Sequence, residues 1–207
     1  MGRTSNAKSR LIATAMALMY VRGDEAVGVH EICTQAGVYQ GSFYHCFPSK
    51  QALVLAVIDT YGAHIRGLWE DVMTTDGSLR ERLQRVFAHT YSVHDQLLTG
   101  SGQLYGCPLG NLALELGGQD PVVRQKLHAM FSAWARVIER SLREAMASGA
   151  LPALDPVTTA QTVVAYFEGV MMLAKTQQTP EVLTQLAHGA VALVEAAAGA
   201  SLSAEHG

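Results

Sequence analysis

Apolar side chains recur every three or four residues along most of the chain, with polar residues between them. The longest such run lies between Pro121 and Gly149, where one helical face carries Val123, Leu127, Met130, Phe131, Trp134, Ile138, Leu142 and Met146. Alternating strand-like segments bounded by hairpin dipeptides are missing from the sequence. The pattern therefore predicts an all-α fold with about nine helices.

Several of these helices begin at a residue that can cap them. Three prolines each follow a side chain with an oxygen, in the pairs Asp120-Pro121, Asp155-Pro156 and Thr179-Pro180. Such an oxygen accepts from a backbone N–H of the first turn, and a proline at the first helical position has no N–H to satisfy. Ser78 and Glu81 have the spacing of a capping box. We also expect Ser49 to cap a long helix that starts near Lys50. The last two helices are expected at about 156–177 and 180–199.

The N-terminal quarter of the chain has the layout of a helix-turn-helix. One face of a first helix, which we expect to end near Gly23, carries Ile12, Ala15, Met16 and Met19. A short helix, HEICTQA, follows Gly28, and a tight break at Gly37 precedes a third helix. Two short helices joined by a glycine-containing turn, after a longer helix, are typical of DNA-binding helix-turn-helix units.

The segment after that break, YQGSFYHCFPSK at 39–50, has two faces. Phe43 and Phe47 are four residues apart, so they belong on the buried face of a helix that begins near Gln40. The opposite side carries the hydrogen-bonding side chains of Gln40, Ser42, Tyr44 and His45. Gly41 lets the backbone approach a phosphate, and Lys50 adds a cation beside the N-terminus of the next helix. A helical core accounts for the two phenylalanines but not for the polar side, which indicates contact with DNA.

Charge and composition narrow the class of protein. The 207 residues carry a formal net charge of −3, which argues against a broad polyanion-binding surface. The first fifty residues hold five basic and three acidic side chains, whereas the rest hold ten and fifteen. This asymmetry favours an N-terminus that faces nucleic acid. We expect a cytoplasmic protein without a membrane span, because no uninterrupted apolar stretch reaches spanning length and MGRTSNAKSR lacks the apolar core of a signal peptide.

Motifs of common catalytic and cofactor sites are missing. The sequence has no GxSxG, HExxH, P-loop or dinucleotide-binding motif, and its eight histidines are scattered. Cys33, Cys46 and Cys107 form no CxxC pair and no zinc-ligand spacing. We therefore expect a protein with reduced thiols that is not an enzyme and needs no metal or cofactor. An enzyme or a purely structural helical protein is the less favoured alternative, since neither explains the polar surface at 39–50.

The sequence AGVYQGSFYHCFPSKQALV resembles the recognition half of the TetR/AcrR family of bacterial transcriptional regulators, and the resemblance covers roughly residues 8–57. It implies an all-α homodimeric repressor that binds a palindromic, double-stranded DNA operator and is released by a small-molecule inducer. Residues 1–50 would form the DNA-binding domain, residues 51–200 the regulatory domain and residues 201–207 a tail. The family pairs its last two helices between subunits, and the alanine- and glycine-rich helices here are expected to do the same.

The same resemblance assigns roles at the DNA. The residues expected at the major groove are Gln40, Gly41 and Ser42, and Gln40 would read a base edge. Phosphates would be held by Tyr44, His45 and Lys50, which position the protein without specifying sequence. Two positions depart from the family pattern. Cys46 stands where a second aromatic residue is common, and Gly28 stands where the second helix usually has a Thr or Ser cap.

A candidate sensor lies in LYGCPLGNLALEL, at 104–116. Pro108 suits the first position of a helix, which makes Cys107 its N-cap. A thiolate there faces the positive end of the helix dipole, and we expect the glycine-rich approach to leave the thiol accessible. No Lys or Arg lies between Arg85 and Arg124, so a cation beside the thiolate must come from elsewhere in the fold.

The regulatory segment also resembles the NemR-like branch of the family, which responds to electrophiles through a cysteine. The matching positions are Cys107 and, near the end of the penultimate long helix, Lys175. The competing interpretation is that Cys107 is a small core residue and that Lys175 complements the C-terminal dipole of its helix. The inducer would then be an apolar or aromatic molecule bound without a covalent bond. Residues that could contact an inducer in either case include Tyr105, Asn111, Phe131, Trp134 and Tyr166, although rings at helical spacing are more often plain core.

Overall fold

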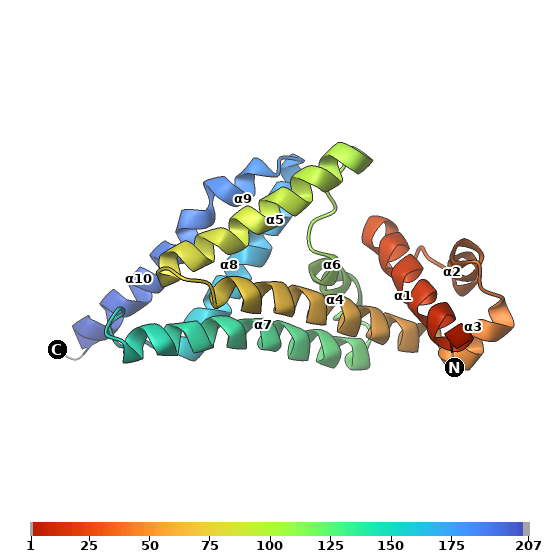
Figure 1. The fold of residues 1–207 in the computed structure, drawn as a ribbon, viewed down its shortest axis with the longest axis horizontal. Helices are drawn as coiled ribbons and strands as arrows, with labels where there is room; N and C mark the ends of the chain where they lie inside the picture. Colours follow the sequence, from red (N-terminus) through yellow and green to blue (C-terminus); the bar gives the residue numbers. More distant parts are fainter. Residues whose placement is uncertain (1, 205–207) are drawn as a thin grey trace. The chain divides into compact units, whose positions relative to one another are not determined.

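The computed structural model describes residues 2–204, with the side chains of residues 6–199, and every regular element in this part of the chain is a helix (Figure 1). In chain order the helices are α1 (Gly2–Arg22), α2 (Val29–Ala36), α3 (Gln40–Cys46), α4 (Lys50–Met73), α5 (Leu79–Ser101), α6 (Pro108–Leu116), α7 (Pro121–Ala147), α8 (Pro156–Gln177), α9 (Glu181–Gln185) and α10 (Ala187–Ala204). The predicted all-α fold is confirmed.

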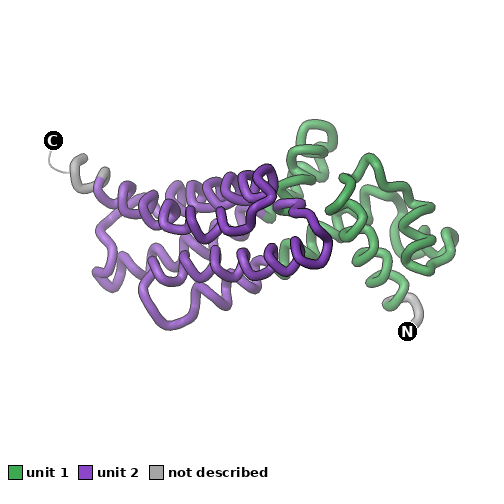
Figure 2. The backbone as a smooth tube through the Cα atoms, turned by 90° about the horizontal axis from the view of Figure 1, so that it is seen from above, with its two compact units in different colours: residues 1–64, 107–130 green, residues 65–106, 131–207 purple. Residues whose placement is uncertain are grey.

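The chain divides into two compact units, which Figure 2 shows in green and purple. The first unit holds residues 1–64 and 107–130, and the second holds residues 65–106 and 131–207. The first unit therefore contains α1, α2, α3 and α6, together with the first parts of α4 and α7. The expected boundary near residue 50, between a DNA-binding and a regulatory domain, stays a prediction. The first unit also contains α6, and compactness alone does not show what α6 does.

In the first unit, α1 packs against α2, α3 and α6. Its buried residues are Leu11, Ala15 and Met19, which recur every four positions and so share one face. Ile12 and Met16, which we expected on that face, lie at its edge and are half-buried. The expected core of the helix-turn-helix is otherwise present, since Ile32, Phe43 and Phe47 are all buried.

The turn between α2 and α3 depends on Gly37. Its φ of 60° and ψ of 39° lie in the left-handed region, where a side chain is unfavourable. Two backbone bonds close the turn, from the N–H of Gly37 to Thr34 and from that of Val38 to Cys33. The N-cap of α2, Gly28, makes no side-chain capping bond.

In the second unit, α5, α8, α9 and α10 pack on one another. The predicted capping box is present, because the backbone N–H of Ser78 donates to Glu81 Oε2 over 2.7 Å and the N–H of Glu81 donates back to Ser78 Oγ over 3.3 Å. Asp155 also caps as expected, since its carboxylate accepts from the N–H groups of Val157 and Thr158. In the first unit, Asp120 and Ser49 cap α7 and α4 in the same way.

The C-terminal helical region differs from the prediction in three respects. Thr179 does not cap, because its hydroxyl donates to the carbonyl of Gln177. The expected single helix at 180–199 is divided at Leu186, whose φ of −94° and ψ of 0° end α9 before α10 begins. The structure also continues α10 to Ala204, into the expected tail, and residues 205–207 lie outside the described residues.

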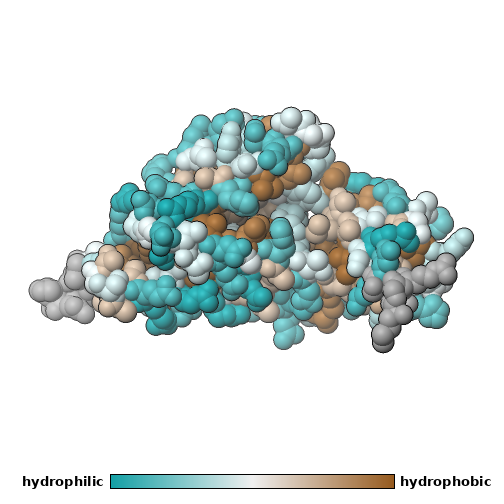
Figure 3. Space-filling view, viewed as in Figure 1, coloured by the Kyte–Doolittle hydropathy of each residue, from teal (hydrophilic) through white to brown (hydrophobic). Residues whose placement is uncertain are grey.

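Most of the surface drawn in Figure 3 is polar, with separate apolar patches between. Two segments, Pro156–Gln177 and Glu181–Gly199, are apolar and long enough to span a membrane by length and composition, which the sequence pattern had not led us to expect. Both belong to helices that pack in the second unit, where α8 buries eight residues, among them Val163, Phe167 and Met171. Their apolar character therefore has an explanation in the core of this unit.

Candidate DNA interface and sensor site

The two faces of α3 are separated as the sequence predicts. Phe43 is completely buried and Phe47 is 3% exposed, whereas the side chain of Tyr44, one residue after Phe43, is 56% exposed. The outer side also carries Gln40, Gly41 and His45, which are exposed, and Ser42, which is half-buried. Of the α3 residues expected to meet DNA, the structure thus leaves Gln40, Gly41, Tyr44 and His45 exposed to solvent.

Two basic residues of α1 fix the position of α3. The guanidinium of Arg10 donates to the carbonyl of Gly37 over 3.0 Å, at the turn before α3. The ammonium of Lys8 lies 5.5 Å from the centre of the Phe47 ring, a cation–π contact at the other end of that helix. Both contacts come from α1, which therefore supports the recognition helix.

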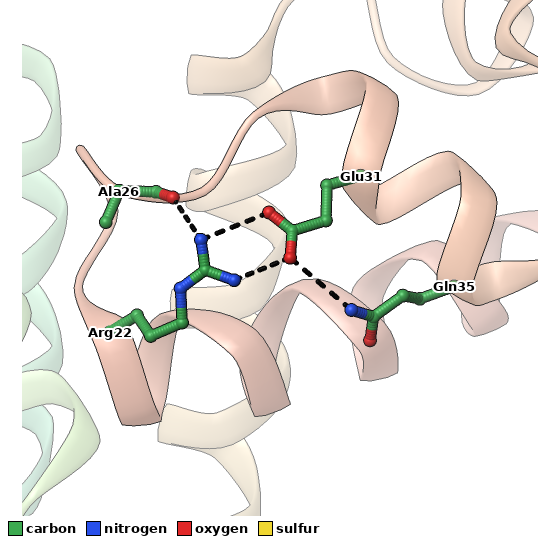
Figure 4. A network of polar contacts seen from close by, with 4 residues as sticks. All are labelled: Arg22, Ala26, Glu31 and Gln35. Carbon is green, nitrogen blue, oxygen red and sulfur yellow. Dashed lines mark hydrogen bonds and ion pairs between the residues drawn. The ribbon is translucent and has the colours of Figure 1, made fainter.

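A polar network ties the C-terminus of α1 to α2 (Figure 4). Arg22 donates from Nη1 to Glu31 Oε1 over 2.5 Å and from Nη2 to Oε2 over 3.2 Å, a bidentate pair. The same Nη2 donates to the carbonyl of Ala26, and Gln35 Nε2 donates to Glu31. The network therefore fixes the orientation of α2 relative to the C-terminus of α1, before the turn that leads to α3.

Lys50, which we expected to contact a phosphate, is paired with Asp24 in the structure. Its Nζ lies 3.0 Å from Asp24 Oδ2 and donates over 2.5 Å to the Asp24 carbonyl. The Lys50 side chain is 28% exposed, and its two contacts with Asp24 use two of the three donor positions of the ammonium. Lys50 therefore remains a candidate phosphate contact, but Asp24 holds it in place.

Sequence reasoning did not single out Tyr39 or the outer face of α2. Tyr39 is the N-cap residue of α3 and, with 88% of its side chain exposed, lies next to Gln40 on the same surface. His30, Thr34 and Gln35 are exposed on α2. Tyr39 stands four positions before Phe43, at the spacing of the core face, so helical periodicity gave no signal that its ring would be exposed.

Cys107 is the N-cap of α6, as predicted. Its Sγ accepts from the backbone N–H of Gly110 over 3.4 Å, and Pro108 occupies the first turn. The thiol is 7% exposed, so the expectation of an accessible thiol is wrong. The physical reason is that Leu109, which follows in the first turn of α6, is completely buried and draws the helix start into the core. Asn111 is half-buried on the same helix.

The segment leading to Cys107 is held by the end of α8. The side-chain amide of Gln178 pairs with the backbone of Leu104, accepting from its N–H over 2.8 Å and donating to its carbonyl over 2.9 Å. The aliphatic part of Lys175 packs against Gly106, where an added Cβ would lie 3.2 Å from Lys175 Cδ. Lys175 is therefore a neighbour of Gly106, the residue before Cys107. In the same segment, the Tyr105 hydroxyl donates to Gln103 Oε1.

Three of the four aromatic candidates, Phe131, Trp134 and Tyr166, lie in a packed cluster in the second unit. Phe131 meets Trp134 edge-on at 5.4 Å between ring centres, and Trp134 lies 5.6 Å from Trp69. Tyr166 joins the cluster through Phe87, at 6.3 Å. Its hydroxyl donates to the carbonyl of Leu186, and burial raises the pKa of this phenol. Trp134 is 1% exposed, which makes it a core residue.

The other two thiols differ in their surroundings. Burial raises the pKa of the Cys33 thiol, which makes it a poor nucleophile near neutral pH. Cys46, at the end of α3, is half-buried. Over the described residues the three cysteines form no disulfide, and no group of three or more His, Cys, Asp or Glu side chains could hold a metal ion.

Comparison with known proteins agrees with this geometry. Residues 11–57 match the family model described as "Bacterial regulatory proteins, tetR family". Residues 79–190 match the model described as "Tetracyclin repressor-like, C-terminal domain". The two matches together cover the helix-turn-helix and most of the remaining helices.

Individual relatives point the same way. The transcriptional regulator AcuR of Cereibacter sphaeroides is 32% identical over 86% of this chain and 81% of its own length. The repressor NemR of Escherichia coli is 27% identical over 87% of this chain and 90% of its own length. The crystal structure of reduced NemR has a TM-score of 0.77 at 22% identity, covering 91% of this chain and 97% of that one. The crystal structure of a regulatory protein TetR from Rhodobacter sphaeroides has a TM-score of 0.75 at 28% identity, covering 88% of this chain and 96% of that one. From its helix-turn-helix and these matches, the chain belongs to the TetR family of transcriptional regulators.

Proposed function

We propose that this repressor acts as a homodimer that inserts α3 of each subunit into successive major grooves of a palindromic operator. The observation that carries the proposal is the polar surface of α3, where Gln40, Tyr44 and His45 are exposed while Phe43 and Phe47 are buried. Gln40 would hydrogen-bond a base edge, while Gly41 and Ser42 allow the backbone to approach the DNA. Tyr44, His45 and Lys50 would contact phosphates.

The proposal is tested by fluorescence-anisotropy titration of the purified protein with the DNA upstream of its own gene. Tyr44→Phe removes one phosphate-directed hydroxyl, so we expect it to weaken binding to all operator sequences by a similar factor, about tenfold at most. Gln40→Ala should instead relax the preference for one base pair in each half-site. Unchanged affinity and unchanged base preference in both variants would remove α3 from the DNA interface.

Pairing of two subunits through α8 and α10 is the second part of the proposal. Both helices present apolar or small residues outward, including Val157, Met172 and Leu173 on α8 and Ala192 and Ala196 on α10. Members of the family typically act as dimers. A dimer with a two-fold axis explains why the operator should be a palindrome. DNA in the cytoplasm would be the site of action.

For the inducer, we favour an electrophile or oxidant that reacts at Cys107. The support is the place of the sulfur at the N-terminus of α6, where it already accepts a backbone N–H and where the helix dipole stabilises a thiolate. Lys175 packs on the preceding residue, Gly106, and would bring a cation toward that segment. The similarity to NemR is a further, weaker support.

Peptide mapping after limited treatment with N-ethylmaleimide tests this assignment. We expect Cys107 to be modified before Cys33, whose thiol has a raised pKa, and before Cys46. Cys107→Ser should abolish that first modification, and Cys46→Ser should leave it intact. Preferential modification of Cys46 would count against sensing at Cys107.

The burial of Cys107 favours a second candidate inducer, an apolar or aromatic molecule bound without covalent reaction. A thiol that is 7% exposed admits bulky reagents slowly. Side chains available to such a ligand include Tyr105, Asn111, Phe131, Trp134 and Tyr166. Release of operator DNA by an apolar compound from Cys107→Ser as well as from wild type would support this alternative.

A further inference from the structure

A carboxylate from α6 binds the turn that follows α1. The backbone N–H groups of Asp24 and Glu25 donate to Glu115 Oε2 and Oε1, over 2.9 Å and 2.8 Å. Consecutive backbone N–H groups after a left-handed residue form a concave anion site, and Glu115 occupies it from about ninety positions further along the chain. Each oxygen receives one bond, so the contact is bidentate.

Gly23 makes this approach possible. Its φ of 82° lies in the left-handed region, which orients the next two N–H groups in the same direction. A Cβ at this position would lie 2.9 Å from Glu115 Oε2 and 3.2 Å from Cδ. Both the backbone conformation of the turn and the space left by the missing side chain at Gly23 therefore suit a carboxylate.

The same turn is held from its other side by Lys50. The Lys50 ammonium binds the carbonyl and carboxylate of Asp24, whose side chain is 14% exposed. Lys50 is the first residue of α4 and comes four positions after α3 ends. Asp24 thus contacts both residues, because its N–H donates to Glu115 and its oxygens accept from Lys50. These contacts form a continuous polar connection from α6 to the start of α4, which follows the recognition helix.

We propose that Glu115 is a positioning residue for operator binding, which fixes the 23–25 turn and through it the direction of Lys50. The inference rests on the proposed DNA contact of Lys50. Loss of the carboxylate frees two N–H groups, so the turn loosens and Lys50 is no longer presented to a phosphate. Because α6 is nine residues long and begins at the Cys107 cap, a displacement of the helix start also moves Glu115.

The test compares Glu115→Ala and Glu115→Gln with Glu25→Ala. The control removes a negative charge from the same turn but leaves both N–H donors and Glu115 in place. Hydrogen exchange followed by NMR should show faster exchange at the amides of Asp24 and Glu25 in Glu115→Ala, with the remaining amides of α1 unchanged. Glu115→Gln keeps one acceptor oxygen and should lie between Glu115→Ala and wild type.

Operator binding supplies the second measurement. We expect Glu115→Ala to bind about tenfold more weakly and its salt dependence to lose about one unit of slope, which corresponds to one phosphate contact. A merely structural role would reduce the amount of folded protein and leave the slope unchanged. Wild-type affinity, tighter binding or an unchanged slope in Glu115→Ala would overturn the proposal. Failure of wild type to bind DNA would instead refute the proposed function, while the exchange result would still test the turn.

Discussion

Single side chains decide which face of α3 meets solvent. Phe43 and Phe47 anchor the helix from inside, and replacing a buried phenylalanine by alanine typically costs about 3–5 kcal/mol. The Tyr44 ring meets Phe43 edge-on at 5.2 Å between ring centres, so its position is restrained while Tyr44 stays 56% exposed. Packing of Phe43 in the core therefore also restrains the neighbouring Tyr44, which we expect to contact DNA.

At Gly41, we expect stability and DNA binding to respond differently to substitution. A Cβ at this position would meet no protein atom within 4 Å, and alanine is favoured over glycine in a helix by up to about 1 kcal/mol. We expect Gly41→Ala to melt at the same or a higher temperature but to bind the operator more weakly, because the methyl group would keep the backbone away from the DNA. Thermal unfolding and anisotropy on the same preparation check both parts. Unaltered operator affinity would place Gly41 outside the interface.

Residue spacing predicted this face, but it could not predict the partners of its charges. The separation of the buried Phe43 from the exposed Tyr44 follows from helical geometry, and the seven residues of α3 are enough to predict it. The pairing of Lys50 with Asp24, and of Glu115 with the amides of Asp24 and Glu25, joins positions 26 and about ninety residues apart. Contacts of that kind depend on the three-dimensional arrangement and leave no periodic signal.

At the scale of elements, capping side chains begin five of the helices in the described part of the chain. Asp120, Asp155, Ser78, Ser49 and Cys107 all cap the helices at which they were predicted. The division at Leu186 was missed because the apolar pattern continues through it and no Gly or Pro marks the break. The burial of Cys107 was missed because a glycine-rich approach indicates flexibility of the backbone, not exposure of the side chain.

Two of these caps, Asp120 and Asp155, and Glu81, the capping-box partner of Ser78, predict how stability responds to acid. The pKa of Asp120 is lowered by its bond with Gln51 and by the N–H groups of α7, and that of Asp155 by its bonds with Thr158. The pKa of Glu81 is lowered by the backbone N–H of Ser78. Because the folded-state pKa lies below the unfolded-state value, each carboxylate stabilises the fold above the unfolded pKa and loses that effect as the pH falls through the folded pKa.

We therefore expect the melting temperature to fall as the pH is lowered below about 4, the ordinary range of carboxyl pKa values. Asp155→Asn keeps an acceptor oxygen but does not titrate, so its decline with acid should be shallower than that of wild type. Differential scanning fluorimetry between neutral pH and pH 3 measures both curves. Parallel curves for the two proteins would show that Asp155 does not contribute to acid sensitivity.

On the scale of the whole molecule, the chain is a TetR-family repressor whose regulation requires two states. An inducer can release DNA only if it stabilises the DNA-incompetent state more than the competent one. The proposals for sensing and for operator binding both involve the short helix α6, which has the thiol of Cys107 at its start and the carboxylate of Glu115 near its end. The sequence predicted the family and the sensor candidate, whereas the link through Glu115 required the structure.

The most direct test of this account is release of operator DNA by a mild electrophile such as a quinone. Anisotropy would be recorded for wild type, Cys107→Ser and Cys46→Ser on the DNA upstream of the gene. We predict that all three bind, that the quinone releases wild type and Cys46→Ser, and that Cys107→Ser stays bound. Release of Cys107→Ser together with wild type would contradict covalent sensing at the start of α6.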